Sequence, residues 1–266
     1  MMEILEYAFF RNALIAVAVI SIVSAIVGTY VVSRRMVFIT GGITHASFGG
    51  LGLGFFLGMN PTLMAAVAAV SAGLLVEWLS GKGKVREDSA IGVVWALGMA
   101  LGTIFIFLTP GYVPELTSFL FGNILTITTG DLWLFGGYGV VLLGAFACCY
   151  ERILMCAFDK DFAATRGLNP RLVNGAMMVL TALCVVLTIR LIGIMLLLSL
   201  LTLPQMISER WARGFAGMMV LSAIVSVVSG VTGLMCSYWF DVPASAAIVI
   251  ILIALYVISR LVKIRG

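Results

Sequence analysis

Long uninterrupted runs of apolar residues, separated by short polar segments, recur along the whole chain. A helix that crosses a membrane needs about 20 mostly apolar residues, whereas a strand of a membrane β-barrel needs about ten in alternation. The runs here are continuous and of the longer kind. They predict an all-α polytopic membrane bundle of about eight or nine transmembrane helices, at residues 12–33, 41–59, 62–80, 89–109, 131–150, 172–190, 192–208, 214–238 and 243–260.

Residues 110–129 do not fit this pattern. Two prolines and Gly122 interrupt an otherwise apolar segment. Proline removes a backbone donor and glycine favours turns, so both disfavour a straight helix. The segment is expected to be a connection that lies at the membrane interface or dips into it.

The positions of the basic residues predict the orientation. Apart from Arg11 and Arg190, every Lys and Arg falls in one of five segments that the span count puts on the same side of the membrane, 34–35, 82–86, 152–171, 210–213 and 260–265. Basic residues accumulate on the cytoplasmic side. We therefore expect an extracytoplasmic N-terminus, a cytoplasmic C-terminus and a single transmembrane domain, residues 1–266.

The composition narrows the possible functions. Hydrophobic residues make up 62% of the chain and charged residues 11%, so lipid is its main surrounding. The sequence contains no GxxxxGK[ST] phosphate-binding loop, no HExxH motif and no CxxC pair. Since the charges lie in loops between spans, nucleic acid is not an expected partner. We predict a membrane protein that is not an enzyme, binds no permanent cofactor and depends on another chain for any ATP hydrolysis.

The second apolar run contains a ridge of small residues at intervals of four. Its members are Gly42, Ala46, Gly50, Gly54 and Gly58. Such a ridge lets a neighbouring helix approach until the two backbones pack against each other. The ridge therefore predicts close helix packing.

His45 is the only histidine of the chain and lies beside this ridge. At about 1.5 Å per residue it is about 10–15 Å from the cytoplasmic end of the span, near mid-depth. Ionisable groups at that depth usually face a polar interior. Two interpretations stay open: an imidazole hydrogen-bonded to a neighbouring helix, or a ligand of a transition metal.

The segment 151–171 shows the signals of a short helix outside the membrane. Asp159 is a suitable N-cap, Gly167 a suitable end, and Phe158 and Phe162 lie four residues apart on one face. A short amphipathic helix of this kind either lies at the membrane surface or docks into the groove of a partner.

Six segments, taken together in their order, resemble the permease subunits of ABC importers for zinc, manganese or iron. They are RRMVFITGGITHASFGGLGLGF (34–55), REDSAIGVVWALGMALG (86–102), SFLFGNIL (118–125), FDKDFAATRGLN (158–169), IRLIGIMLLLSLLTLP (189–204) and GLMCSYWFDVPASAAIV (233–249). The resemblance implies a cobalamin-permease-like helical fold, in which residues 1–266 form a single transmembrane permease domain of the cytoplasmic (inner) membrane. It also implies a homodimer, two cytoplasmic ABC ATPase subunits and an extracytoplasmic metal-binding protein.

The resemblance also implies roles for particular residues. The segment that matches Phe158–Gly167 is the helix that couples the permease to the ATPase, here about residues 157–168, with Phe158, Asp159, Phe162, Ala163 and Gly167. The histidine that matches His45 lies on the metal path. This chain departs from the family at two positions, with Gly41 in place of an aspartate and Gly49 in place of a proline.

The expected function is therefore a permease for a divalent transition metal, zinc ahead of manganese or iron. Two alternatives remain, a permease for a metal chelate or cofactor and a secondary transporter that needs no ATPase. The latter would need a proton or ion relay, and the apolar runs contain almost no carboxylates for one.

Overall fold

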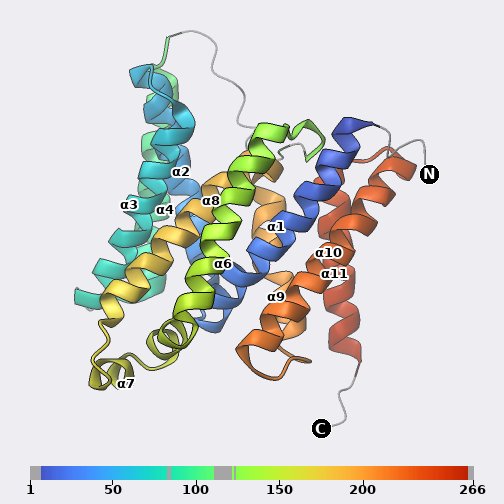
Figure 1. Ribbon diagram of the computed structural model, residues 1–266. Helices are drawn as coiled ribbons and strands as arrows, with labels where there is room; N and C mark the ends of the chain where they lie inside the picture. Colours follow the sequence, from blue (N-terminus) through green and yellow to red (C-terminus); the bar gives the residue numbers. More distant parts are fainter. Residues whose placement is uncertain (1–6, 83–84, 111–121, 123, 263–266) are drawn as a thin grey trace. The chain divides into compact units, whose positions relative to one another are not determined.

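The computed structural model describes residues 7–82, 85–110, 122 and 124–262, and every regular element among them is a helix (Figure 1). The predicted all-α class is confirmed. The helices are α1 (Ala8–Ser33), α2 (Val37–Leu57), α3 (Pro61–Lys82), α4 (Glu87–Leu108), the 3₁₀ turn η2 (Ile124–Thr126), α6 (Thr129–Phe158), α7 (Lys160–Thr165), α8 (Pro170–Leu200), α9 (Leu203–Ser208), α10 (Gly214–Phe240) and α11 (Ala244–Leu261).

Seven helical stretches of the described chain are long and apolar enough to cross a membrane. One of them, Pro170–Ser208, has 39 residues and would extend about 58 Å, about twice the thickness of the hydrocarbon core. It is broken at Gly193, whose φ of 77° and ψ of 171° suit only glycine. The stretch therefore has room for both spans predicted at 172–190 and 192–208.

Helix α2 is not among these seven, although its 21 residues extend about 31 Å. Its six glycines and His45 lower its mean hydropathy below that of the seven stretches. Thirteen of its residues are buried, because α3 and α4 pack against it. The span predicted at 41–59 thus corresponds to a helix that faces protein more than lipid.

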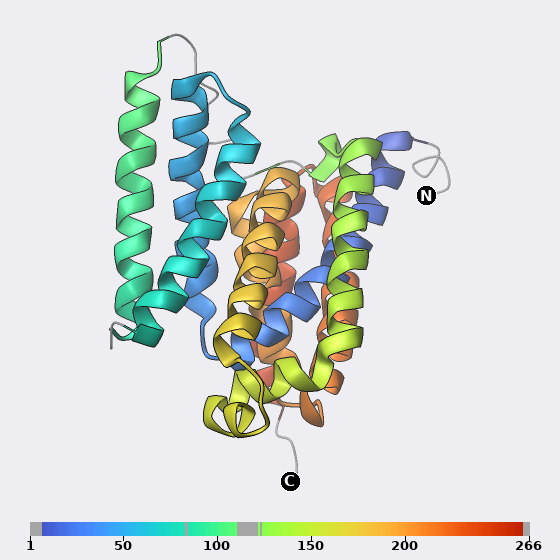
Figure 2. The ribbon, with the colours of Figure 1, turned by 60° about the vertical axis from the view of Figure 1, so that its left-hand side comes forward.

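The described chain contains two compact units, and α2, α3 and α4 belong to the one formed by residues 33–115 and 141–187. These three helices lie side by side in both views (Figures 1 and 2). Their ends are joined by Arg34, whose guanidinium lies 3.7 Å from the carboxylates of both Glu77 and Glu87. The side chain of Arg34 is only 4% exposed. This buried ion-pair cluster therefore holds α3 and α4 close to the N-terminal end of α2.

The other unit, residues 1–32, 116–140 and 188–266, contains α9, α10 and α11 packed together. Helix α1 joins them where Gly230 of α10 lies against Val17. Gln205 is fully buried and donates hydrogen bonds to the carbonyls of Ser24 and Leu200, both at 3.1 Å. Arg190, one of the two basic residues outside the predicted cytoplasmic segments, is paired with Asp131 at 3.3 Å.

Two segments differ from, or go beyond, the sequence prediction. The span predicted to end at residue 150 continues as α6 to Phe158, with a kink at Cys149, because residues 151–158 are apolar enough to extend the helix. Of the ambiguous segment 110–129, residues 111–121 and 123 lie outside the described residues, as does most of the segment 118–125 that supports the family resemblance. In its described part, the amide of Asn12 donates to the carbonyl of Ile127.

Candidate functional site

The interface between α2 and α4 is built from glycines on both helices. A Cβ atom placed on Gly98 of α4 would lie 2.5 Å from Cα of Ala46 and 2.6 Å from the carbonyl oxygen of His45. No ordinary contact is that close, so the two backbones touch here without intervening side chains. Further down the interface, Gly52 of α2 lies against Gly102 of α4 in the same way.

The small-residue ridge of α2 serves two neighbours rather than one. Gly42 and Ala46 lie against α4, whereas Gly50 and Gly54 lie against Met64 and Pro61 of α3. Gly58 follows the helix as its left-handed C-cap, with a φ of 65° and no atom within 4 Å of an added Cβ. The ridge therefore winds around α2 and brings α3 and α4 close on adjacent faces.

His45 is half-buried on α2 and is held by two side chains of α4. Its ring stacks on the indole of Trp95, with 4.3 Å between ring centroids and 23° between planes. Its Nδ1 lies 3.0 Å from the thioether Sδ of Met99. Trp95 and Met99 are one helical turn apart and so present one face of α4 to the imidazole.

The described residues bring no cluster of three His, Cys, Asp or Glu side chains together, around His45 or elsewhere. Gly41, one turn before His45, leaves room for the indole of Trp95, since a Cβ there would lie 2.6 Å from the ring. The position where the resembled family has a carboxylate is thus occupied by an aromatic ring. His45 offers one strong nitrogen ligand, with a thioether as its near neighbour.

Helix α7 has the ends that the sequence predicted. The carboxylate of Asp159 accepts a hydrogen bond of 2.8 Å from the backbone N–H of Phe162, as an N-cap does. Gly167 follows with a φ of 76°, and the next N–H, from Leu168, reaches back to the carbonyl of Ala163 at 3.1 Å. This glycine-ended cap stops the helix after one and a half turns.

The faces of α7 have different surroundings. Ala163 is fully buried, whereas Phe162 is 46% exposed and Phe158, at the end of α6, is 63% exposed. Arg166 lies over the ring of Phe162, 5.4 Å from its centroid. Phe162 and Arg166 thus form a small outward surface at a helix that Ala163 anchors, and Phe158 is a second exposed ring just before that helix.

A cavity of about 700 Å³ lies beside this helix, within the same compact unit. It is lined by residues from the C-terminal end of α3, from α7 and from the start of α8. Side chains of both charges line the cavity, namely Glu77, Lys160, Asp161 and Arg171. Because Glu77 also pairs with Arg34, the cavity lies at the end of the unit where the ion-pair cluster joins α3 and α4.

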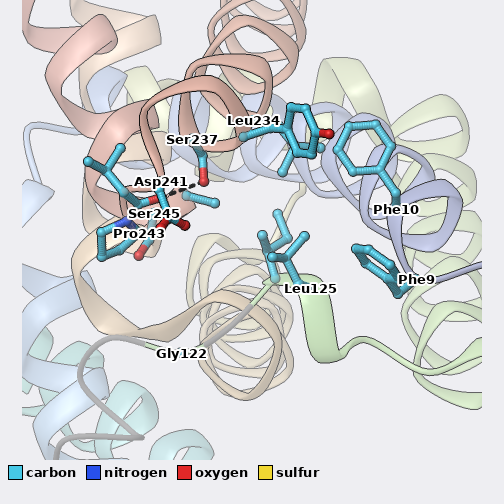
Figure 3. A pocket seen from close by; sticks show the side chains of 13 residues that line it. Phe9, Phe10, Gly122, Leu125, Leu234, Ser237, Asp241, Pro243 and Ser245 are labelled. Atoms are coloured by element: carbon cyan, nitrogen blue, oxygen red, sulfur yellow. Dashed lines mark hydrogen bonds between the residues drawn. The ribbon is translucent and has the colours of Figure 1, made fainter. Parts of the chain in front are cut away.

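A second cavity, of about 720 Å³, belongs to the other unit (Figure 3). Asp241, Ser237 and Ser245 line one end, and Phe9 and Phe10 lie at the other. Asp241 is the left-handed C-cap of α10. The cavity offers one carboxylate, which is too few strong ligands to define a metal site.

Sequence reasoning did not single out Trp95, Met99 or the Arg34 cluster. The spacing of Trp95, Gly98, Met99 and Gly102 does mark a face of α4 on which small and large residues alternate. That pattern alone does not say which helix the face meets. The structure supplies the missing pairing of α4 with α2.

Comparisons with known proteins agree with this architecture. The sequence profile of the ABC 3 transport family matches residues 6–263. A probable metal transport system membrane protein of Chlamydia pneumoniae is 34% identical, over 92% of this chain and 86% of its own. The manganese transport system membrane protein MntC of Listeria monocytogenes is 29% identical, over 97% and 92%.

A solved structure gives the same result. PsaBC from Streptococcus pneumoniae, in complex with a Fab, superimposes with a TM-score of 0.86 at 28% identity, over 98% of this chain and 95% of the other. The family profile spans nearly the whole sequence, and the fold match spans the same length. This chain belongs to the ABC 3 transport family.

Proposed function

We propose that this chain is the permease subunit of an ATP-driven ABC importer for a divalent transition metal, zinc ahead of manganese or iron. Its relatives include proteins named for metal and manganese transport. The observation that carries the proposal is His45, a half-buried imidazole in the middle part of α2, a helix packed against two others. Imidazole is a common ligand for transition metals, and an ionisable side chain within a membrane span is a candidate functional group.

The translocation path in this proposal passes His45. One imidazole and one thioether do not hold a divalent ion firmly, so further ligands have to come from another surface. A second copy of the chain, related by two-fold symmetry, would bring a second His45 to the path. We therefore propose a homodimer with the path along its axis and brief, weak coordination of the metal as substrate.

The proposed orientation puts the N-terminus outside and the C-terminus in the cytoplasm of the cytoplasmic (inner) membrane. Basic residues at one end of the α2–α4 unit, Arg34 beside Glu77 and Lys160 and Arg171 around the cavity, support a cytoplasmic assignment of that end. An extracytoplasmic metal-binding protein would deliver the metal on the opposite side.

Helix α7 is the proposed contact with the cytoplasmic ABC ATPase. Aromatic residues and arginine are enriched in protein interfaces, and this segment exposes Phe158, Phe162 and Arg166. Asp159 and Gly167 determine where the helix begins and ends, and the buried Ala163 packs one side of the helix against the rest of the permease. ATP binding and hydrolysis would move α7 and, through it, α6 and α8, and so alternate access to the path.

Metal uptake by cells that express the permease, its ATPase and its binding protein tests this proposal. We expect uptake of free metal to stop when the Walker A lysine of the ATPase is replaced. Uptake that continues with the inactive ATPase would instead indicate a secondary transporter. Uptake that is blocked by excess metal chelate, and not by excess free metal, would indicate a chelate permease.

A further inference from the structure

The environment of His45 contains a second potential metal ligand, Met99. The thioether Sδ and the imidazole Nδ1 are 3.0 Å apart, and both side chains reach the surface of their compact unit, Met99 with 36% of its area exposed. Trp95 covers one face of the imidazole. A cation that approaches Nδ1 in the plane of the ring therefore meets sulfur first.

Glycines of the α2–α4 interface set the positions of His45, Trp95 and Met99 relative to one another. Gly98 lies between Trp95 and Met99 in sequence and touches the backbone of His45 and Ala46. This contact brings both α4 side chains to the imidazole, Trp95 against its face and Met99 Sδ near its Nδ1. Because Gly41 has no side chain, it leaves space for the indole of Trp95. The arrangement thus depends on backbone contact, on ring stacking and on one polar contact, between Nδ1 of His45 and Sδ of Met99.

We propose that His45 Nδ1 and Met99 Sδ form a nitrogen–sulfur ligand pair on the metal path, and that Met99 is a specificity-determining residue that favours Zn²⁺ over Mn²⁺. The inference rests on the proposed function. Thioether and imidazole suit softer ions such as zinc, whereas manganese prefers carboxylate and carbonyl oxygens. Near His45, Gly41 stands where the resembled family has a carboxylate, and the indole of Trp95 occupies that space. The donors that remain, imidazole nitrogen and thioether sulfur, are of the softer kind.

The geometry is compatible with shared coordination. With bonds of about 2.0 Å to nitrogen and about 2.3 Å to sulfur, two ligands at a tetrahedral angle lie about 3.5 Å apart. The Nδ1–Sδ distance, now 3.0 Å, needs to increase by about 0.5 Å, and the unbranched side chain of methionine has the torsional freedom for this. The neutral imidazole then carries its proton on Nε2 and presents the lone pair of Nδ1 to the cation.

Competitive uptake of radioactive zinc and manganese by the complete importer tests the proposal. The wild type is expected to prefer zinc, and Met99→Leu, which keeps the volume and removes the sulfur, is expected to lower the zinc-to-manganese ratio about tenfold. Met59→Leu is the matched control, because Met59 is an exposed methionine just after α2 and should leave the ratio unchanged. An unchanged ratio in Met99→Leu would overturn the assignment.

A binding measurement on the purified full-length permease separates this inference from the proposed function. Because Trp95 stacks on His45, its fluorescence in a variant with the other four tryptophans replaced by phenylalanine should report a cation at Nδ1. We expect Met99→Leu to weaken the zinc response about tenfold and leave the manganese response unchanged. If His45→Ala abolishes uptake while Met99→Leu binds zinc normally, the ligand pair is wrong and the path past His45 stands.

Discussion

Replacing Phe162 with aspartate is expected to abolish metal uptake while leaving the permease folded. The ring is 46% exposed on α7, so the substitution creates no buried charge. Truncating an aromatic anchor at an interface costs at least about 2 kcal/mol, or about thirtyfold in affinity, and a charge in its place adds a desolvation cost. Uptake and co-purification of the ATPase with the permease measure the effect.

The control for this experiment is Phe162→Leu, which keeps an apolar contact and should retain most of the uptake. Helix α7 itself should survive both changes, because its cap depends on the side chain of Asp159 and on the backbone N–H of residue 162. An aspartate variant that still couples ATP hydrolysis to transport would show that the ATPase docks elsewhere.

Replacing Gly98 with alanine is expected to have a large effect on stability. The new methyl group would lie 2.5–2.7 Å from backbone atoms of His45 and Ala46, which cannot rotate away as a side chain can. Helices α2 and α4 would have to separate, at a cost of about 3 kcal/mol. The thermal unfolding midpoint of the purified permease should fall, and the contact between His45 and Met99 should be lost with it.

Gly92 provides a control on the same helix. It is exposed, and a Cβ added there meets no atom within 4 Å. Alanine is also the better helix former, so Gly92→Ala should leave the midpoint unchanged or raise it. Equal midpoints for the two alanine variants would mean that the glycine contact between α2 and α4 does not hold the unit together.

The sequence predicted the spans well because lipid imposes a simple rule on length and polarity. Seven of the nine predicted apolar runs agree with the observed helices within a few residues at each end, one of them being the part of α8 before the break at Gly193. The run at 192–208 instead covers the last part of α8 and the separate helix α9, and the run ending at residue 150 continues to Phe158. The caps of α7 were also predictable, since Asp159 and Gly167 act through neighbours in the sequence.

The surroundings of His45 were not predictable in the same way. The glycines of α2 indicate that some helix comes close, but the partner that stacks on the imidazole comes from α4, about fifty residues later. Trp95 and Met99 are ordinary residues of an apolar span until that pairing is known. The ion pairs of Arg34 were likewise not predictable, because Glu77 and Glu87 lie more than forty residues after Arg34 in the sequence.

Metal uptake by wild type and His45→Ala, each co-expressed with the ATPase and the binding protein, tests the central claim most directly. Zinc, manganese and iron should be compared in cells with equal amounts of assembled complex. We expect His45→Ala to lose zinc uptake while the complex still assembles, since no other histidine exists in the chain to replace the ligand. Unchanged uptake of all three metals would mean that the imidazole serves packing alone and that the metal path lies elsewhere.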